Sequence, residues 1–321
     1  GDTLESAHRV SRFSYDGQSI GDERVLFDVP IDRGCCHTGG SMAFDPDGNL
    51  YISFGDNTNP FATAYAPIDD RPGRELWDAR RSSANTQDLR GKIVRIRPQP
   101  DGTYTIPEGN LFTDPEEGRP EIYTMGHRNP YRISIDPETR FLYWGDVGPD
   151  ARLDSIAGPI GYDEVNQARQ AGNFGWPLFI ADNKAYAARD HATGEIGQPF
   201  DPARPINDSR FNTGARVLPP AEGAMIYYPY ERSAEFPLLG EGGRTAMAGP
   251  VYRAASYGGS DVRLPDYYDG RFIFYEWIRG WMMAATLDEE GDLVSMEPFL
   301  DHIAFDHPMD VELGPDGSLY V

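Results

Sequence analysis

Cysteine is almost absent from this chain of 321 residues, where it occurs only at Cys35 and Cys36. Two adjacent cysteines cannot supply the ligands of a structural zinc site by themselves. The Cys-x-x-Cys-His signal for covalent haem attachment is also missing. No apolar run approaches the roughly 18 residues that a membrane-spanning helix needs. These absences exclude a cysteine-rich zinc protein, a protein with covalently attached haem and a helical membrane protein.

Basic residues are few relative to acidic ones. The chain has 29 Lys and Arg residues against 51 Asp and Glu residues, which gives a formal net charge of −22. A chain of this charge repels phosphate backbones, so we exclude nucleic acid as a partner. Acidic side chains suit calcium, whose ligands are oxygen atoms, although most of this charge is equally explained by a solvated acidic surface.

Turn residues and aromatic residues are abundant, and one pattern recurs. An Asp-Pro or Pro-Asp-Gly turn with alternating apolar residues on both sides is typical of a β-hairpin. This pattern occurs at residues 41–56, 132–146 and 310–321. Copies of one hairpin at long, uneven intervals favour the blades of a β-propeller with insertions between them.

Further segments predict the outer strands and the loops. Alternating or apolar runs at residues 92–97, 272–275 and 282–287 predict strands. The stretches 57–90 and 178–243 are rich in Pro, Asn, Asp and Gly, which predicts long loops on one face of a rigid scaffold. Functional residues are commonly carried by such loops.

The two ends of the chain bear on the size of the propeller. The chain begins in a strand-like segment, Arg9–Phe13, and ends inside a hairpin. We therefore expect an all-β fold, a β-propeller that is incomplete in this chain, with about three whole blades and partial ones beside them. Residues 1–321 would form one domain of a larger chain, or a propeller that further domains or a partner chain close.

A histidine followed by two glycines precedes the first hairpin, in the segment Cys35–Gly40. Glycines allow a tight turn and the close approach of a ligand. A histidine at the edge of a strand can act as a general base near neutral pH, so His37 is the candidate catalytic residue. The alternative is a turn histidine without a role.

Two more clusters flank the second hairpin. Gly126–Pro130 contains Arg128 and Asn129, which offer a planar cationic fork and a two-way hydrogen-bonding amide. Carbonyl groups of a Gly-Pro turn with carboxylates close behind can hold calcium. Such a turn at Gly148 and Pro149 is followed by Asp163 and Glu164. A surface turn and a solvated acidic pair are the alternatives.

Taken together, these clusters resemble the soluble pyrroloquinoline quinone-dependent aldose sugar dehydrogenases, the glucose/sorbosone dehydrogenase family. The family pattern runs from His-x-Gly-Gly through Gly-Lys-Ile-x-Arg-Ile and Gly-x-Arg-Asn-Pro to Asp-Glu-x-Asn and Asn-Tyr-Gly-Trp-Pro. This chain contains each motif in that order between His37 and Pro177, with Phe174 in place of tyrosine. The resemblance continues more weakly through Gly249-Pro250, the strands around residues 277–287 and the last hairpin.

The resemblance implies a six-bladed β-propeller with the quinone over its top face. It implies that His37 is the base that takes the proton of a sugar hydroxyl and that Asp56 orients it. The residues it implies for the cofactor are Arg128, Asn129 and, at a position where the family commonly has lysine, Arg279. It further implies calcium at Gly148 and Pro149, and a second ion is expected around Asp163 and Glu164.

The chain departs from the family at two further places. The family often has Arg-x-Arg before the last hairpin, where this chain has His307-Pro308-Met309. A different grip on the quinone, a different cofactor and no cofactor are all compatible with this change. The adjacent cysteines are unusual for the family's best-known members, and we predict a vicinal disulfide between Cys35 and Cys36, with two reduced cysteines as the alternative.

The leading hypothesis is therefore an oxidoreductase that oxidises a sugar or related alcohol by hydride transfer to pyrroloquinoline quinone, with calcium. The rival is a non-catalytic secreted propeller that serves as a carbohydrate-binding or assembly module. A disulfide requires an oxidising compartment, so we expect the protein to be secreted or periplasmic. The sequence does not identify the electron acceptor.

Overall fold

The computed structural model describes residues 6–32 and 36–321. Its regular elements in these residues are strands and short 3-10 segments, without an α-helix. The prediction of an all-β fold is therefore confirmed. None of the described segments is a helix that is long and apolar enough to cross a membrane.

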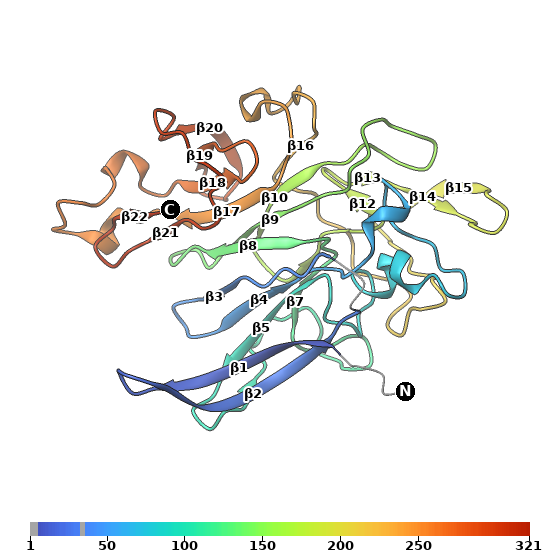
Figure 1. The fold of residues 1–321 in the computed structure, drawn as a ribbon, viewed down its shortest axis with the longest axis horizontal. Helices are drawn as coiled ribbons and strands as arrows, with labels where there is room; N and C mark the ends of the chain where they lie inside the picture. Colours follow the sequence, from blue (N-terminus) through green and yellow to red (C-terminus); the bar gives the residue numbers. More distant parts are fainter. Residues whose placement is uncertain (1–5, 33–35) are drawn as a thin grey trace.

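Three large sheets form the body of the molecule (Figure 1). The first contains β3 (Met42–Phe44), β4 (Leu50–Phe54), β5 (Lys92–Pro98) and β7 (Ile122–Met125), extended by β6 (Tyr104–Thr105) and β11 (Gly172–Asn173). The second contains β8 (Pro130–Ile135), β9 (Leu142–Asp146), β10 (Asp163–Ala168) and β16 (Ile226–Tyr228). The third contains β17 (Ala246–Val251), β18 (Phe272–Glu276), β19 (Met282–Leu287) and β20 (Leu293–Phe299).

The repeated sequence pattern forms hairpins at all three places. The pairs are β3 with β4, β8 with β9, and β21 (Glu312–Leu313) with β22 (Leu319–Tyr320). In the first, the side chain of Asp45 accepts hydrogen bonds from the backbone N–H groups of Asp47 and Asn49. Gly48 closes this turn with a φ of 83°, which favours glycine. The aspartate and glycine that predict a turn in the sequence are thus the residues that form it in the structure.

The three sheets lie side by side, with β8 in contact with both β3 and β17. The second and third sheets share a core in which Tyr143 stacks on Phe272, with ring centroids 4.2 Å apart. Gly145 permits this close packing, because a Cβ there would lie 2.1 Å from the carbonyl oxygen of Ala246. The arrangement is the one expected of neighbouring blades, while the number of blades and the incompleteness of the propeller stay predictions.

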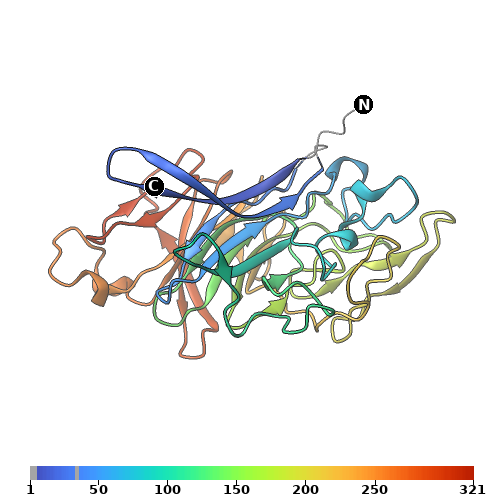
Figure 2. The ribbon, with the colours of Figure 1, turned by 90° about the horizontal axis from the view of Figure 1, so that it is seen from below.

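The remaining elements surround the sheets. A long ribbon of β1 (Ala7–Tyr15) and β2 (Ile20–Pro30) lies along one side (Figure 2). The predicted loop 57–90 contains only 3-10 segments, namely η1 (Pro60–Ala62), η2 (Glu75–Trp77) and η3 (Ala79–Arg81). The predicted loop 178–243 also contains short strands, which are β12 (Phe179–Ile180), β13 (Lys184–Ala185), β14 (Ala187–Arg189), β15 (Ile196–Pro199) and β16, and the segment η4 (Pro237–Leu239). The segments η5 (Ala254–Tyr257) and η6 (Asp266–Tyr268) lie between β17 and β18.

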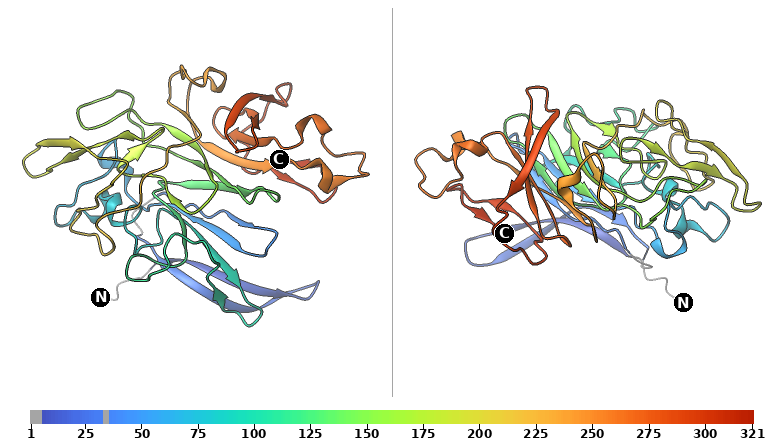
Figure 3. Two further views of the ribbon diagram at one scale, coloured as in Figure 1. Left: turned by 180° about the vertical axis from the view of Figure 1, so that it is seen from behind. Right: turned by 90° about the horizontal axis from the view of Figure 1, so that it is seen from above.

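The loop 57–90 and the first part of the stretch 178–243 lie together at the end of the molecule away from the C-terminus (Figure 3), whereas the last part of that stretch, around Leu239, packs against the third sheet. The strands of the first two sheets begin or end at the same place. Pro130 at the start of β8 and Glu164 near the start of β10 both pair with Asp146, the last residue of β9. Residues adjacent to these strand ends therefore meet beneath the loops.

Candidate functional site

The turn that carries His37 has a strained backbone. Cys36 and His37 have φ angles of 78° and 53°, a region that residues other than glycine rarely occupy. The turn packs directly against the end of β4, because a Cβ at Gly55 would lie 2.1 Å from the carbonyl oxygen of His37. Cys35 lies outside the described residues, so its disulfide with Cys36 stays a prediction.

Asp56 connects His37 to a tryptophan from a distant part of the chain. The carboxylate is buried, and its Oδ1 lies 2.7 Å from Nδ1 of His37. Its Oδ2 accepts a hydrogen bond of 2.9 Å from Nε1 of Trp176, and Oδ1 also accepts from the backbone and hydroxyl of Thr58. Because Nδ1 of His37 faces Asp56, Nε2 is the ring nitrogen left to take a proton. The pair has the geometry of an oriented general base.

The surroundings keep the imidazole of His37 neutral. Burial, together with the positive charge of Arg128, lowers the pKa of His37 below its ordinary value of 6.5, against the opposite influence of Asp56. Burial alone would raise the pKa of Asp56, but its interactions with His37 and Arg128 outweigh burial and lower that pKa. At neutral pH the pair is therefore a neutral imidazole beside a carboxylate, which is the form that can accept a proton.

Arg128 and Asn129 are fixed beside this pair by the end of β9. The carboxylate of Asp146 accepts the backbone N–H of Arg128 at 3.0 Å and that of Asn129 at 2.6 Å. The carbonyl group of Arg128 in turn accepts the backbone N–H of Asp56 at 2.8 Å. The structure thus brings together four of the residues that the sequence singled out, from three separate segments.

The donors beside His37 match the chemistry of an anionic cofactor. Arg128 brings a guanidinium whose Nη1 donates to the carbonyl of Val147 at 2.7 Å. Oδ1 of Asn129 accepts the N–H of Gly39 at 3.1 Å, which leaves its amide nitrogen as a donor. A guanidinium fork and an amide fit the carboxylates and carbonyls of a quinone such as pyrroloquinoline quinone.

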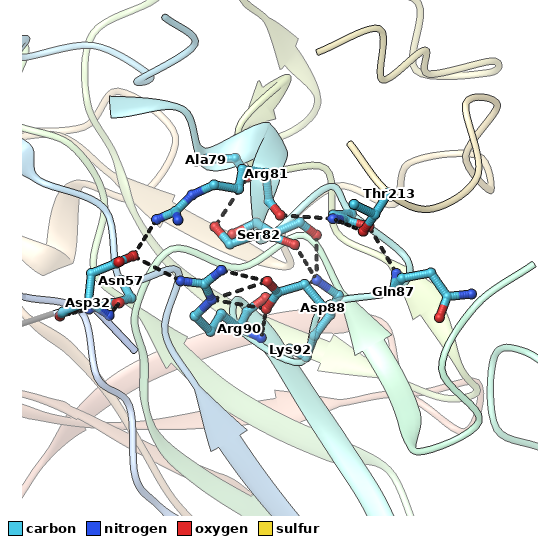
Figure 4. Close-up of polar contacts among 12 residues, drawn as sticks. Asp32, Asn57, Ala79, Arg81, Ser82, Gln87, Asp88, Arg90, Lys92 and Thr213 are labelled. Carbon is cyan, nitrogen blue, oxygen red and sulfur yellow. Dashed lines mark hydrogen bonds and ion pairs between the residues drawn. The ribbon is translucent and has the colours of Figure 1, made fainter. Parts of the chain in front are cut away.

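A network of ion pairs supports the segment that leads into the histidine turn (Figure 4). The carboxylate of Asp32 accepts hydrogen bonds from Arg81 at 2.6 Å and Arg90 at 3.1 Å. Its backbone N–H donates to Oδ1 of Asn57 at 2.6 Å. Asn57 is the next residue after Asp56, and Asp32 lies five residues before His37. The network therefore links the chain near both members of the His37–Asp56 pair to loop 57–90.

A buried lysine holds the same loop against β5. The Nζ of Lys92 donates to the carbonyl groups of Ser82, Ser83 and Arg90, at 2.7 to 2.9 Å. Burial lowers the pKa of Lys92 to about 7. Arg90 also forms a bidentate pair with Asp88, as Figure 4 shows. These contacts hold the loop against the start of β5.

The turn at Gly148 and Pro149 follows β9 and is held by an arginine that precedes β17. Nη1 of Arg244 donates to Oδ1 of Asp163 at 2.7 Å, and its Nη2 donates to the carbonyl of Pro149. Oδ1 of Asp163 also accepts the N–H of Gly148 at 3.0 Å, and Oδ2 accepts the N–H of Ala246 at 2.9 Å. Both oxygens of this buried carboxylate are therefore engaged.

The residues predicted to hold calcium do not form a common oxygen cage. The carbonyl of Pro149 and the carboxylate of Asp163 both face Arg244. Glu164 is the next residue of the strand, where successive side chains point to opposite faces, and its Oε1 accepts the N–H of Ala181. Calcium takes about six to eight oxygen ligands. The arrangement does not fit calcium, and both calcium sites stay predictions.

Arg279 is engaged with the backbone. Its guanidinium donates to the carbonyl groups of Pro229, Leu239, Gly242 and Gly243. Four of its five N–H donors are thereby used, which is a structural role. Its predicted part in cofactor binding stays a prediction. His307, in the place of the family's Arg-x-Arg, is exposed, and its ring packs against Trp277 with centroids 4.7 Å apart.

Comparison with known proteins identifies the family. Residues 1–226 match the family model described as Glucose / Sorbosone dehydrogenase, which is more than half of the chain. The chain belongs to the glucose/sorbosone dehydrogenase family. The resemblance predicted from the ordered motifs between His37 and Pro177 is therefore confirmed. Arg244 and Arg279 lie beyond the matched residues.

Two curated relatives match parts of the chain. The aldose sugar dehydrogenase YliI of Escherichia coli is 30% identical over 168 residues, which cover 52% of this chain and 36% of that protein. Quinoprotein glucose dehydrogenase B of Acinetobacter calcoaceticus is 26% identical over 226 residues, which cover 66% and 43%. The chain thus spans less than half the length of these relatives.

Solved structures of the family share the fold. The PQQ-bound aldose sugar dehydrogenase of Streptomyces coelicolor aligns over 97% of this chain and 64% of its own, with a TM-score of 0.55 and 18% identity. The apo form of the soluble aldose sugar dehydrogenase of Escherichia coli aligns over 98% and 69%, with a TM-score of 0.54 and 20% identity. At these identities the likeness concerns the fold alone.

Two residues of the site had no role in the sequence analysis. Trp176 lies in the segment Asn173–Pro177, which matches the family motif Asn-Tyr-Gly-Trp-Pro, and this match is the sequence signal for it. Arg244 was not singled out at all. An arginine that immediately precedes an apolar strand is the only sequence signal for it, and such a residue is more often exposed than buried.

Proposed function

We propose that this chain carries the catalytic centre of a quinone-dependent dehydrogenase that oxidises a sugar or related alcohol. The observation that supports it most is the neutral His37, oriented by the buried Asp56 and next to the cation of Arg128. Membership of the glucose/sorbosone dehydrogenase family supports the same class of reaction.

The chain's own residues would act as follows. Nε2 of His37 accepts the proton of the substrate hydroxyl, and Asp56 stabilises the imidazolium that forms. The hydrogen on the carbon that bears this hydroxyl leaves with its electron pair, so that the alcohol becomes a carbonyl compound. The quinone supplies the acceptor for that hydride. Arg128 and Asn129 would hold its anionic and carbonyl groups, and the charge of Arg128 also lowers the pKa of His37.

The proposal is tested by reconstitution. The purified protein is incubated with pyrroloquinoline quinone, with calcium and separately with EDTA, and dye reduction is followed on a panel of sugars and simple alcohols. We expect turnover of at least one sugar that requires both the quinone and the protein. Saturable sugar binding without turnover under every condition would instead support a binding module.

The rival function rests on two observations. Arg279, a predicted cofactor residue, is engaged with four backbone carbonyl groups, and His307 stands where the family often has a cation. If these changes abolish quinone binding, the loops above His37 remain as a carbohydrate-binding surface. We further propose that the protein works in the periplasm or outside the cell, as the predicted disulfide requires.

A further inference from the structure

The guanidinium of Arg244 occupies the centre of the Gly148–Pro149 turn. It lies between the carbonyl of Pro149 and the carboxylate of Asp163, and it donates to both. Its side chain is 1% exposed, so it is an interior group rather than a surface residue that happens to reach the turn. A carbonyl and a carboxylate directed at one point form a site for a cation.

The space around the guanidinium is shaped by small residues. A Cβ at Gly161 would lie 2.8 Å from Nη2 of Arg244, and a Cβ at Gly148 would lie 3.3 Å from its Nη1. The ring of Tyr230 covers the other side, with the guanidinium carbon 4.1 Å from the ring centroid. Two glycines and one aromatic face thus enclose a planar cation rather than a spherical ion with its own ligands.

Tyr230, which covers the guanidinium, also contacts Asp150 at the end of the turn. The hydroxyl of Tyr230 donates to Oδ1 of Asp150 at 2.6 Å, and Arg152 lies over the ring of Tyr230, 4.0 Å from its centroid. Each residue from Gly148 to Asp150 is therefore held by a contact that involves Arg244, Asp163 or Tyr230. None of these contacts requires a bound ion.

We propose that Arg244 is a built-in replacement for a divalent cation at the Gly148–Pro149 turn. Its side chain supplies the positive charge between Pro149 and Asp163, and its hydrogen bonds fix the turn, so the wild-type protein takes no calcium there. Removal of the guanidinium leaves an oxygen-lined space with an unpaired carboxylate, which is a place where calcium can bind. This proposal does not depend on the proposed function.

The test compares calcium-dependent stability in the wild type and in Arg244→Ala. Thermal unfolding is measured in EDTA and in calcium at about 1 mM, a concentration that fills weak extracellular sites. Sodium chloride of equal ionic strength corrects for the screening of the acidic chain. We expect the wild type to show no shift beyond the salt effect. Arg244→Ala should unfold at a lower temperature in EDTA and recover part of the loss with rising calcium.

Two further variants keep the result interpretable. Ile96→Val removes one buried methyl group from the core of the first sheet and leaves no carboxylate without a partner, so any loss of stability should be equal in EDTA and in calcium. Arg244→Gln keeps an amide that can donate to the turn, and it serves if Arg244→Ala does not fold. Calorimetric titration with calcium chloride then counts the sites directly.

The possible outcomes separate clearly. Calcium sites in Arg244→Ala or Arg244→Gln that the wild type lacks support the proposal. The proposal is overturned if calcium stabilises the wild type and this effect disappears in Arg244→Ala. It is also overturned if neither Arg244→Ala nor Arg244→Gln responds to calcium. The dye-reduction assay has no part in this test, so failure of the proposed function leaves the result unaffected.

Discussion

The imidazole of His37 bonds to Asp56 through Nδ1, which leaves Nε2 as the nitrogen that can accept a proton. Replacement of His37 by alanine should lower the rate of sugar oxidation by about 10²–10⁴-fold, the contribution of a general base. The chain should still fold, with some loss of stability, because the side chain of His37 is only 8% exposed but Asp56 keeps Thr58 and Trp176 as partners. Rates and circular dichroism check this. His302→Ala, a change at an exposed histidine, is the control and should leave both unchanged.

The charges around His37 determine the pH dependence of the base. Burial and Arg128 lower the pKa of His37 below 6.5, whereas Asp56 raises it. The neutral base should therefore persist below pH 6.5 in the wild type. Arg128→Ala should move the imidazole titration to higher pH, and Asp56→Asn should move it to lower pH. NMR titration of the histidine signals measures both shifts, and a shift of the two variants in the same direction would contradict this account.

At the scale of the elements, the close approach of the histidine turn to the end of β4 depends on one glycine. Gly55→Ala would place a Cβ 2.1 Å from the carbonyl oxygen of His37. We expect a loss of about 1–3 kcal/mol in the free energy of unfolding, as for other overpacked sites, and a displaced His37 with reduced turnover. Urea unfolding and rate measurements test this. Gly21→Ala, where nothing lies within 4 Å of the added Cβ, should change neither quantity.

The hairpins could be predicted because their determinants are local. Asp45 and Gly48 set the first turn within four residues of sequence, and the alternation beside them set the strands. The residues around His37 were found for a different reason, since each stands in an ordered family motif. The sequence predicted which residues matter there, while the hydrogen bond that joins Asp56 to Trp176 required the structure.

The arginine at residue 244 could not be predicted, because its meaning depends on long-range contacts. Asp163 is separated from it by 81 residues and Pro149 by 95 residues. From the sequence alone Asp163 and Glu164 formed an acidic pair suited to calcium. The strand that contains them directs the two side chains to opposite faces, and only the packing of the third sheet against the second brings an arginine to one of them.

At the scale of the whole molecule, buried acids determine how stability varies with pH. Burial raises the pKa of Asp146 and Glu276 to about 7 and that of Glu164 to about 8. Because these folded-state values exceed the ordinary carboxyl pKa near 4, the folded chain binds more protons than the unfolded chain between these limits. Their stabilising contribution is present below about pH 4 and is lost as pH rises towards 8.

The contribution of these acids to stability should therefore fall as pH rises from about 4 to about 7, a fall that the net charge of −22 reinforces. Lys92, with its pKa lowered to about 7, acts in the opposite direction only above pH 7, where it offsets the remaining effect of Glu164, so the expected fall ends near pH 7. Calorimetric unfolding temperatures across this range check the slope. Glu276→Gln, which removes one titrating acid, should flatten the slope, and an unchanged or steeper slope would refute the assignment.

The hydrogen bond between Trp176 and Asp56 joins residues 120 positions apart, and it gives the molecule an optical reporter of its own centre. Indole fluorescence responds to the charge and mobility of groups that bond to its nitrogen. The emission of Trp176 should therefore change whenever Asp56 changes partner, whether through ligand entry or through loss of tertiary structure. This bond forms only when distant loops have come together. A chain with its hairpins formed but its sheets unassembled would therefore not show the fluorescence change. The formation of the His37–Asp56 centre can thus be timed separately from the formation of the strands.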